Sequence, residues 1–113
     1  MRIRDDIDEL THRLRSDPDA VWARMRSLLG ERGVDPSKSL LLDFFTDDSN
    51  LYWGLVVTPD RRAIQFDYAY AGREPSDGTF ASWTDVTDAT EFTHAGLVEA
   101  GLFRWDEEKG AIL

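Results

Sequence analysis

The first third of the chain has apolar residues at helical spacing. They recur every three or four positions between residues 2 and 16, and charged residues fill the positions between them. The members of this apolar stripe are Ile3, Ile7, Leu10 and Leu14. A period of this kind predicts an amphipathic helix over residues 2–16 with one buried side.

A second helical stripe follows after a very short connection. Asp17 fits the N-cap of this helix and Pro18 its first position, where the missing N–H of proline costs nothing. Gly30 or Gly33 fits its end. The apolar residues of the stripe are Val21, Trp22, Met25, Leu28 and Leu29. Because so few residues join the two helices, we expect an antiparallel or sharply angled helical hairpin.

Beyond Lys38 the period changes from helical to extended. Apolar and alternating runs are separated by Gly, Pro, Asp and Ser clusters, as is typical of strands and turns. The predicted strands cover residues 39–46, 51–58, 63–71 and 79–86. The first of them is almost wholly apolar, which predicts a central strand of the sheet.

The last quarter predicts a third helix. Asp88 and Glu91 have the spacing of a capping box, and the apolar residues that follow are Phe92, Ala95, Val98 and Leu102. Residues 103–113 predict a short closing β-hairpin. The fold class is therefore α+β, in a single domain over residues 1–113. It has an N-terminal helical hairpin, a four-stranded mostly antiparallel sheet, and a C-terminal helix with the short hairpin.

The charge balance excludes several partners. The chain of 113 residues has 22 acidic and 13 basic side chains, for a net charge of −9, and all of this excess lies after residue 38. Direct binding to nucleic acid or to an anionic membrane needs the opposite sign. The acidic field favours a basic protein partner, although solubility alone also explains it. No cysteine is present and the charged segment 1–6 lacks an apolar stretch behind it, so we expect a cytoplasmic protein.

Motifs for catalysis or cofactor binding are missing from the sequence. No glycine-rich phosphate loop or nucleophile elbow occurs, and we expect no cofactor. His12 and His94 each follow a glutamate at the spacing of a di-metal bundle. His12 lies opposite the apolar stripe of its helix, so the pair with Glu9 would face solvent, and Glu91 already has a capping role. We therefore expect no metal site.

Aromatic and acidic residues of the strands suggest a binding surface. If Leu40, Leu42 and Phe44 face the helices, then Leu41, Asp43 and Phe45 face the other way, and alternation places further aromatic and acidic residues beside them. With the acidic turn that follows the first strand, the candidate partner-binding residues are Asp43, Asp47, Asp48, Tyr52, Asp67, Trp83 and Asp85. The alternative is that the third helix covers this face and the aromatic residues are core. Trp53 shares its alternation with Leu51 and Leu55 and is predicted to be core.

These observations favour a non-enzymatic, acidic module that binds a basic protein. In size and charge the chain resembles bacterial immunity or antitoxin proteins, and that resemblance implies a basic nuclease toxin as the partner. The alternative function is a small-ligand-binding domain or minor enzyme with a pocket between sheet and helices. An enzyme would show a carboxylate of perturbed pKa in a pocket, and a binder would show a flat or ridged acidic surface.

Overall fold

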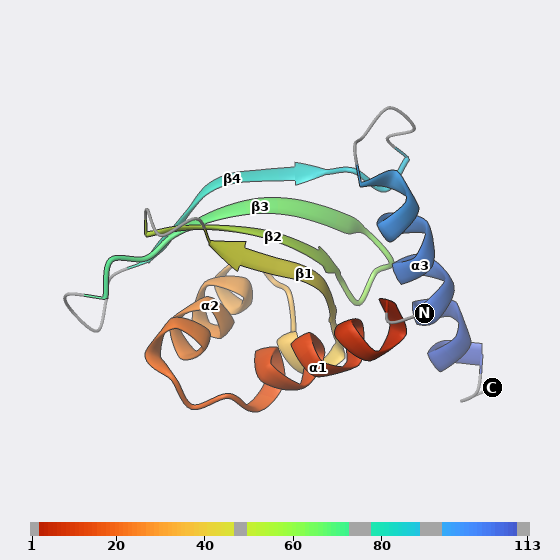
Figure 1. Ribbon diagram of the computed structural model, residues 1–113, viewed down its shortest axis with the longest axis horizontal. Helices are drawn as coiled ribbons and strands as arrows, with labels where there is room; N and C mark the ends of the chain where they lie inside the picture. The colour runs from red at the N-terminus through yellow and green to blue at the C-terminus, as the bar shows by residue number, and fades with distance from the viewer. Residues whose placement is uncertain (1–2, 47–49, 73–77, 89–93, 111–113) are drawn as a thin grey trace.

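Over the residues that the structure describes, the protein has an α+β fold in which three α-helices pack against one antiparallel sheet (Figure 1). The computed structural model describes residues 3–46, 50–72, 78–88 and 94–110. The elements, in chain order, are α1 (Ile3–Ser16), α2 (Ala20–Glu31), a 3-10 turn (Pro36–Lys38), β1 (Leu40–Thr46), β2 (Leu51–Val57), β3 (Ala63–Ala69), β4 (Thr79–Asp85) and α3 (Ala95–Gly110). Among the described residues, no helix has the length and apolar character needed to cross a membrane.

The two N-terminal helices form the predicted hairpin, with a different start for the second. Its N-cap is Asp19, because the Asp17 side chain instead accepts a hydrogen bond from the Asp19 N–H and holds a turn around Pro18. At the other end, Gly33 has φ +77° and its N–H donates to the Gly30 carbonyl, while the Val34 N–H donates to Leu29. This is the Schellman arrangement, which selects Gly33 over Gly30 as the stop.

The strands lie in the order β1-β2-β3-β4, and every neighbouring pair is antiparallel. A bulge interrupts β1, where the pairing steps from Leu41 opposite Val56 to Asp43 opposite Leu55. The extra residue, Leu42, shifts the alternation, so Phe44 comes to lie on the same face as Leu41. The predicted grouping of Phe44 with Leu40 and Leu42 is therefore wrong.

Each face of the sheet has its own apolar cluster. On one face, α2 packs over Leu41, Val56 and the aromatic residues of β3, and this cluster includes Trp22 and Met25. The other face carries a second cluster, in which Leu42, Leu55 and Val57 meet Val98 of α3. Figure 1 shows α1 and α2 beneath the sheet and α3 at its right-hand end.

The prediction of a central position for β1 is wrong, because β1 lies at the edge of the sheet. Its apolar residues are buried because helix α1 covers it and contributes to both clusters. Leu14 belongs to the α2 side and Ile7 to the α3 side. The Leu41 N–H donates to the buried hydroxyl of Thr11 (2.9 Å), and the Arg15 guanidinium donates to the Ser39 carbonyl (2.9 Å). The first bond gives the Leu41 N–H an acceptor beside the bulge, and the second pairs the carbonyl of Ser39, which directly precedes β1.

The predicted C-terminal hairpin is wrong for residues 103–110, which continue α3. Leu102 and Trp105 extend the apolar side begun by Val98 and pack against the cluster on that sheet face. Arg104 joins α3 to α1 through Asp8, at 2.7 Å. The described part of α3 begins at Ala95, and the predicted capping box of Asp88 and Glu91 extends into residues 89–93, which are outside the described residues. Glu91, Phe92 and residues 111–113 lie outside the described residues.

Candidate protein-binding surface

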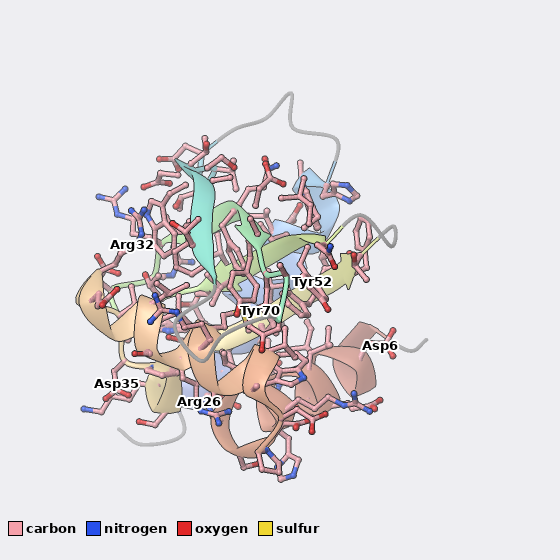
Figure 2. All side chains as sticks on the ribbon, turned by 90° about the vertical axis from the view of Figure 1, so that its left-hand side faces the viewer. Asp6, Arg26, Arg32, Asp35, Tyr52 and Tyr70 are labelled. Atoms are coloured by element: carbon pink, nitrogen blue, oxygen red, sulfur yellow. The ribbon has the colours of Figure 1, made fainter. Side chains whose placement is uncertain are left out.

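The structure separates the predicted partner-binding residues onto opposite faces of the sheet. Tyr52 lies opposite Tyr68, and Trp83 opposite Phe66, both on the face that α2 covers. There the Tyr52 ring stacks on Phe44 with the centroids 5.0 Å apart. Figure 2 looks from the left-hand end of Figure 1 and labels Tyr52. Tyr52 and Trp83 therefore pack against the core, although the helix that covers their face is α2 and not the third helix.

Trp83 also has a cation against it. The Arg32 guanidinium carbon lies 4.6 Å from the centroid of a Trp83 ring. Arg32 follows the end of α2, so this cation–π contact ties that helix to the edge strand β4. The contact indicates a structural role for Trp83.

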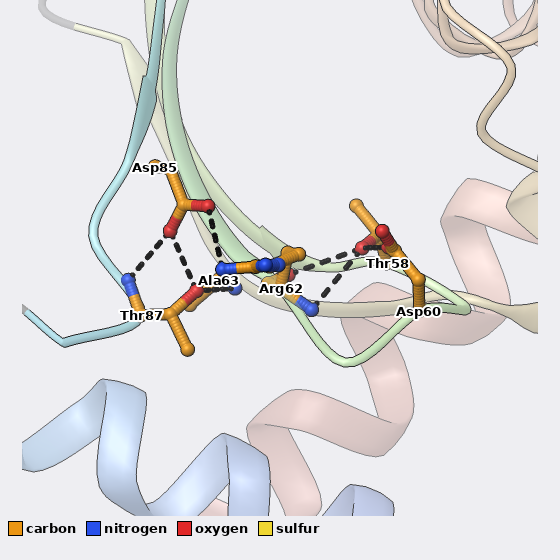
Figure 3. A network of polar contacts seen from close by, with 6 residues as sticks. All are labelled: Thr58, Asp60, Arg62, Ala63, Asp85 and Thr87. Carbon is orange, nitrogen blue, oxygen red and sulfur yellow. Dashed lines mark hydrogen bonds and ion pairs between the residues drawn. The ribbon is translucent and has the colours of Figure 1, made fainter.

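Asp85 closes the end of β4. Its carboxylate accepts hydrogen bonds from the Thr87 N–H (2.9 Å) and hydroxyl (2.6 Å), and Arg62 lies 3.4 Å away (Figure 3). The Thr87 hydroxyl oxygen in turn accepts from the Ala63 N–H. The hydrogen bonds from Thr87 hold the pKa of Asp85 below its ordinary value. This carboxylate thus has its partners within the fold.

Asp43 and Asp67 share the opposite face, on β1 and β3 with β2 between them, and aromatic residues lie beside them. Asp67 pairs across the strands with Trp53, and Trp53 pairs with Phe45. We call this surface the aromatic–acidic face, and it consists of Asp43, Phe45, Leu51, Trp53 and Asp67. It belongs to the same side of the sheet as α3, and Trp53 joins it to the apolar cluster on which α3 packs.

The aromatic–acidic face exposes unusually large apolar side chains. Phe45 is 51% exposed and Leu51 is 40% exposed, although both are large apolar side chains on strands. Trp53 is half-buried rather than core, with the Phe45 ring 5.4 Å away on one side and the His94 ring 4.7 Å away on another. Exposed aromatic residues next to polar ones are typical of protein interfaces.

The two carboxylates of this face have neutral hydrogen-bond donors beside them. Asp43 accepts a hydrogen bond from the Phe44 N–H (2.9 Å), and Asp67 accepts one from the Ser82 hydroxyl (2.7 Å). Among the described residues, no Lys, Arg or His lies within ion-pair distance of Asp43 or Asp67. The neutral donors orient the carboxylates but do not offset their negative charge.

The sequence identified part of this face. Asp43 and Asp67 were predicted, and alternation placed Phe45 beside Asp43. Trp53 was predicted to be core, and Leu51 was not predicted as a binding residue. The signal that could have found Leu51 is its position directly after the acidic turn, where a strand begins at the rim of the sheet. The predicted residues Asp47 and Asp48 lie outside the described residues.

A groove of about 600 Å³ lies elsewhere, between α3 and the end of β4. Val86, Val98 and Leu102 line it, and the Arg61–Asp106 ion pair (2.8 Å) lies at its border. The hydrogen bond from Arg61 keeps the pKa of Asp106 below its ordinary value. A lowered pKa keeps this carboxylate ionised and paired, which is unlike a general acid.

Metal-binding clusters are absent from the part of the chain that the structure describes. His12 is exposed on the solvent-facing side of α1, where its ring lies beside the Ser16 hydroxyl. Glu9 pairs with Arg13 instead (3.5 Å), and His94 packs against Trp53.

No family model matches this chain, and no curated protein or solved structure matches it either.

Proposed function

We propose that this protein binds a basic protein partner through the aromatic–acidic face, without enzymatic activity of its own. The observation that carries the proposal is the pairing of exposed Phe45 and Leu51 with two carboxylates that have no cation among the described residues. Exposing these apolar side chains and carboxylates gives the free protein no stability. The same groups contribute to binding when a partner buries the apolar side chains and neutralises the charge.

The chemistry of the face selects cationic side chains. A partner arginine can lie over Trp53 or Phe45 and reach Asp43 or Asp67 on either side, which combines a cation–π contact with an ion pair. The net charge of −9 adds a long-range field of the same sign. A basic nuclease neutralised in the manner of an immunity protein or antitoxin is a partner of this chemistry.

The test compares two variants of equal net charge. Asp43→Asn/Asp67→Asn removes the two carboxylates of the face, and Asp19→Asn/Glu31→Gln removes two exposed carboxylates from α2 and its cap. Affinity capture from the producing cells should recover a protein of pI above about 9 with the wild type and the control. The face variant should lose it, and so should Phe45→Ala.

Two outcomes would contradict the proposal. One is equal capture by all the variants, which would locate binding elsewhere. The other is binding that stays unchanged as salt rises toward about 1 M, where the Debye length falls to about 3 Å. An electrostatically steered complex should instead associate more slowly as salt rises, while its dissociation rate changes less.

The groove between α3 and β4 supports the second candidate function, small-ligand binding. Its apolar lining and the Arg61–Asp106 pair at its border would suit a small molecule with one polar end. Saturable binding of a small molecule that is lost in Arg61→Gln and unaffected by Asp43→Asn would favour this function over the first.

A further inference from the structure

A second groove, of about 620 Å³, opens between α1 and the start of α3 where both pass over β1. Its floor is apolar, because Leu10, Leu42 and Leu97 meet there from three different elements. Its rim is acidic and consists of Asp6, Glu9 and Asp43, with Arg13 beside them. Figure 2 shows Asp6 at the outer end of α1, on the side away from α2.

The rim carries more negative charge than its one cation can offset. Asp6, Glu9 and Arg13 follow one another at spacings of three and four, so they share one stripe of α1. Arg13 reaches Glu9 at 3.5 Å, and these side chains are 51% and 66% exposed, which makes the pair weak. Asp6 and Asp43 have no cation within ion-pair distance among the described residues.

We infer that this groove seats a basic segment of the partner that also carries leucine-like side chains. The inference rests on the proposed function and names the part of the partner that is bound. Charge complementarity excludes an acidic segment, and the leucine residues of the floor favour a segment with aliphatic side chains over a purely polar segment. Asp43 belongs to both the groove and the aromatic–acidic face, so one segment can pass from α1 to Phe45 without leaving the acidic surface.

Arg13 competes with the incoming cations. It occupies the stripe of α1 that the partner's arginines would contact, and it holds Glu9 in the free protein. Removing its charge should therefore tighten binding, whereas removing the charge of Asp6 and Glu9 should weaken it. Substitutions at neighbouring residues of one helix should thus change the binding affinity in opposite directions, and altered stability alone would not produce that result.

The experiment uses the full chain and a defined probe, the acetylated hexapeptide Arg-Leu-Arg-Leu-Arg-Gly with a fluorescent label, followed by anisotropy. Asp6→Asn/Glu9→Gln should weaken binding about threefold to tenfold, the range expected for exposed ion pairs. Arg13→Gln should strengthen it, and the control Asp19→Asn/Glu31→Gln should leave it unchanged. A second peptide, with serine in place of leucine, should bind more weakly, which tests the floor without altering the protein.

The failure of this inference is distinguishable from that of the proposed function. Asp67 and Phe45 belong to the aromatic–acidic face and do not line the groove, so variants at these two positions test the face alone. Loss of peptide binding in Asp67→Asn with no effect of Asp6→Asn/Glu9→Gln would overturn the inference about the groove and support binding at the face. No binding of the hexapeptide, or equal binding of the serine peptide, would also overturn the inference about the groove. Weaker peptide binding by Asp6→Asn/Glu9→Gln together with unchanged capture of the basic protein by Asp67→Asn and Phe45→Ala would overturn the proposed function instead.

Discussion

The indole ring of Trp53 packs against the imidazole ring of His94, with the ring centroids 4.7 Å apart. Trp53 belongs to β2 and His94 directly precedes α3, so this contact joins the sheet to the C-terminal helix at the border of the aromatic–acidic face. The contact gives Trp53 a structural role on one side, while the other side of the same residue borders the exposed Phe45 ring.

Trp53→Ala should destabilise the protein more than Phe45→Ala. Trp53 is half-buried and packs against the α3-side cluster, so we expect a loss of about 2 kcal/mol, below the roughly 3–5 kcal/mol typical of fully buried large aromatic residues. Phe45 is exposed, and its removal should cost less than about 1 kcal/mol. Urea unfolding of both variants measures the difference. Equal losses would show that the assignment of the two rings is wrong.

Gly54→Ala should be among the most destabilising single substitutions in the sheet. A Cβ at this position would lie 2.2 Å from the ring of Phe66, which is fully buried and has no space to move. Overpacking of this kind should cost about 3 kcal/mol. Phe66→Leu in the same chain should recover part of that loss, which a double-mutant cycle measures.

The matched control for this prediction is Gly30→Ala. Nothing lies within 4 Å of a Cβ built at Gly30, and the residue is inside α2. Alanine should therefore stabilise the protein by up to about 1 kcal/mol through helix propensity. A similar loss in both variants would contradict the steric explanation.

Thr11→Val should cost about 1–3 kcal/mol, because the Leu41 N–H would lose its acceptor in a buried place. Thr11→Ser keeps the hydroxyl and should cost less. Faster amide hydrogen exchange at Leu41 in the valine variant, measured by NMR, would identify the broken bond. Unchanged exchange there would show that another group accepts from the Leu41 N–H.

Asp85→Asn should change how stability depends on pH. The folded protein holds the pKa of Asp85 below the ordinary 3.8, so ionised Asp85 stabilises the fold above that pH. This contribution disappears as pH falls through the lowered pKa. Because the side chain is exposed and screened, the wild type should exceed the variant by less than about 1 kcal/mol at pH 7. Urea titrations at acidic and neutral pH should show the two curves converging in acid. A gap that widens in acid would reverse the assigned sign.

Local patterns in the sequence were sufficient for most of the secondary structure. The stripe from Ile7 to Leu14 predicts α1, and the four extended runs predict the four strands to within two residues at each end. These elements are readable because the periods of helix and strand are intrinsic to the backbone. The charge excess after residue 38 is likewise a property of composition.

The C-terminal helix depended on the tertiary structure. Gly96 and Gly101 lower the intrinsic helix propensity of residues 95–110, and beyond Leu102 the sequence suggested a hairpin in place of the helix. In the fold, Gly101 allows α3 to approach the Leu42 side chain closely, and Val98, Leu102 and Trp105 pack on the sheet. Helices of this kind are stabilised by burial of one face, which only the folded sheet can supply.

The composition of the candidate binding face was also decided by the tertiary structure. Alternation within a strand tells which residues share a side, but it does not say how one strand aligns with the next. The bulge at Leu42 moved Phe44 to the α2 side, and cross-strand pairing placed Tyr52 with it, away from Asp43. The sequence therefore determined that the sheet would carry aromatic and acidic residues. The register and the bulge determined which of them lie together, because those are properties of strand pairing rather than of any single strand.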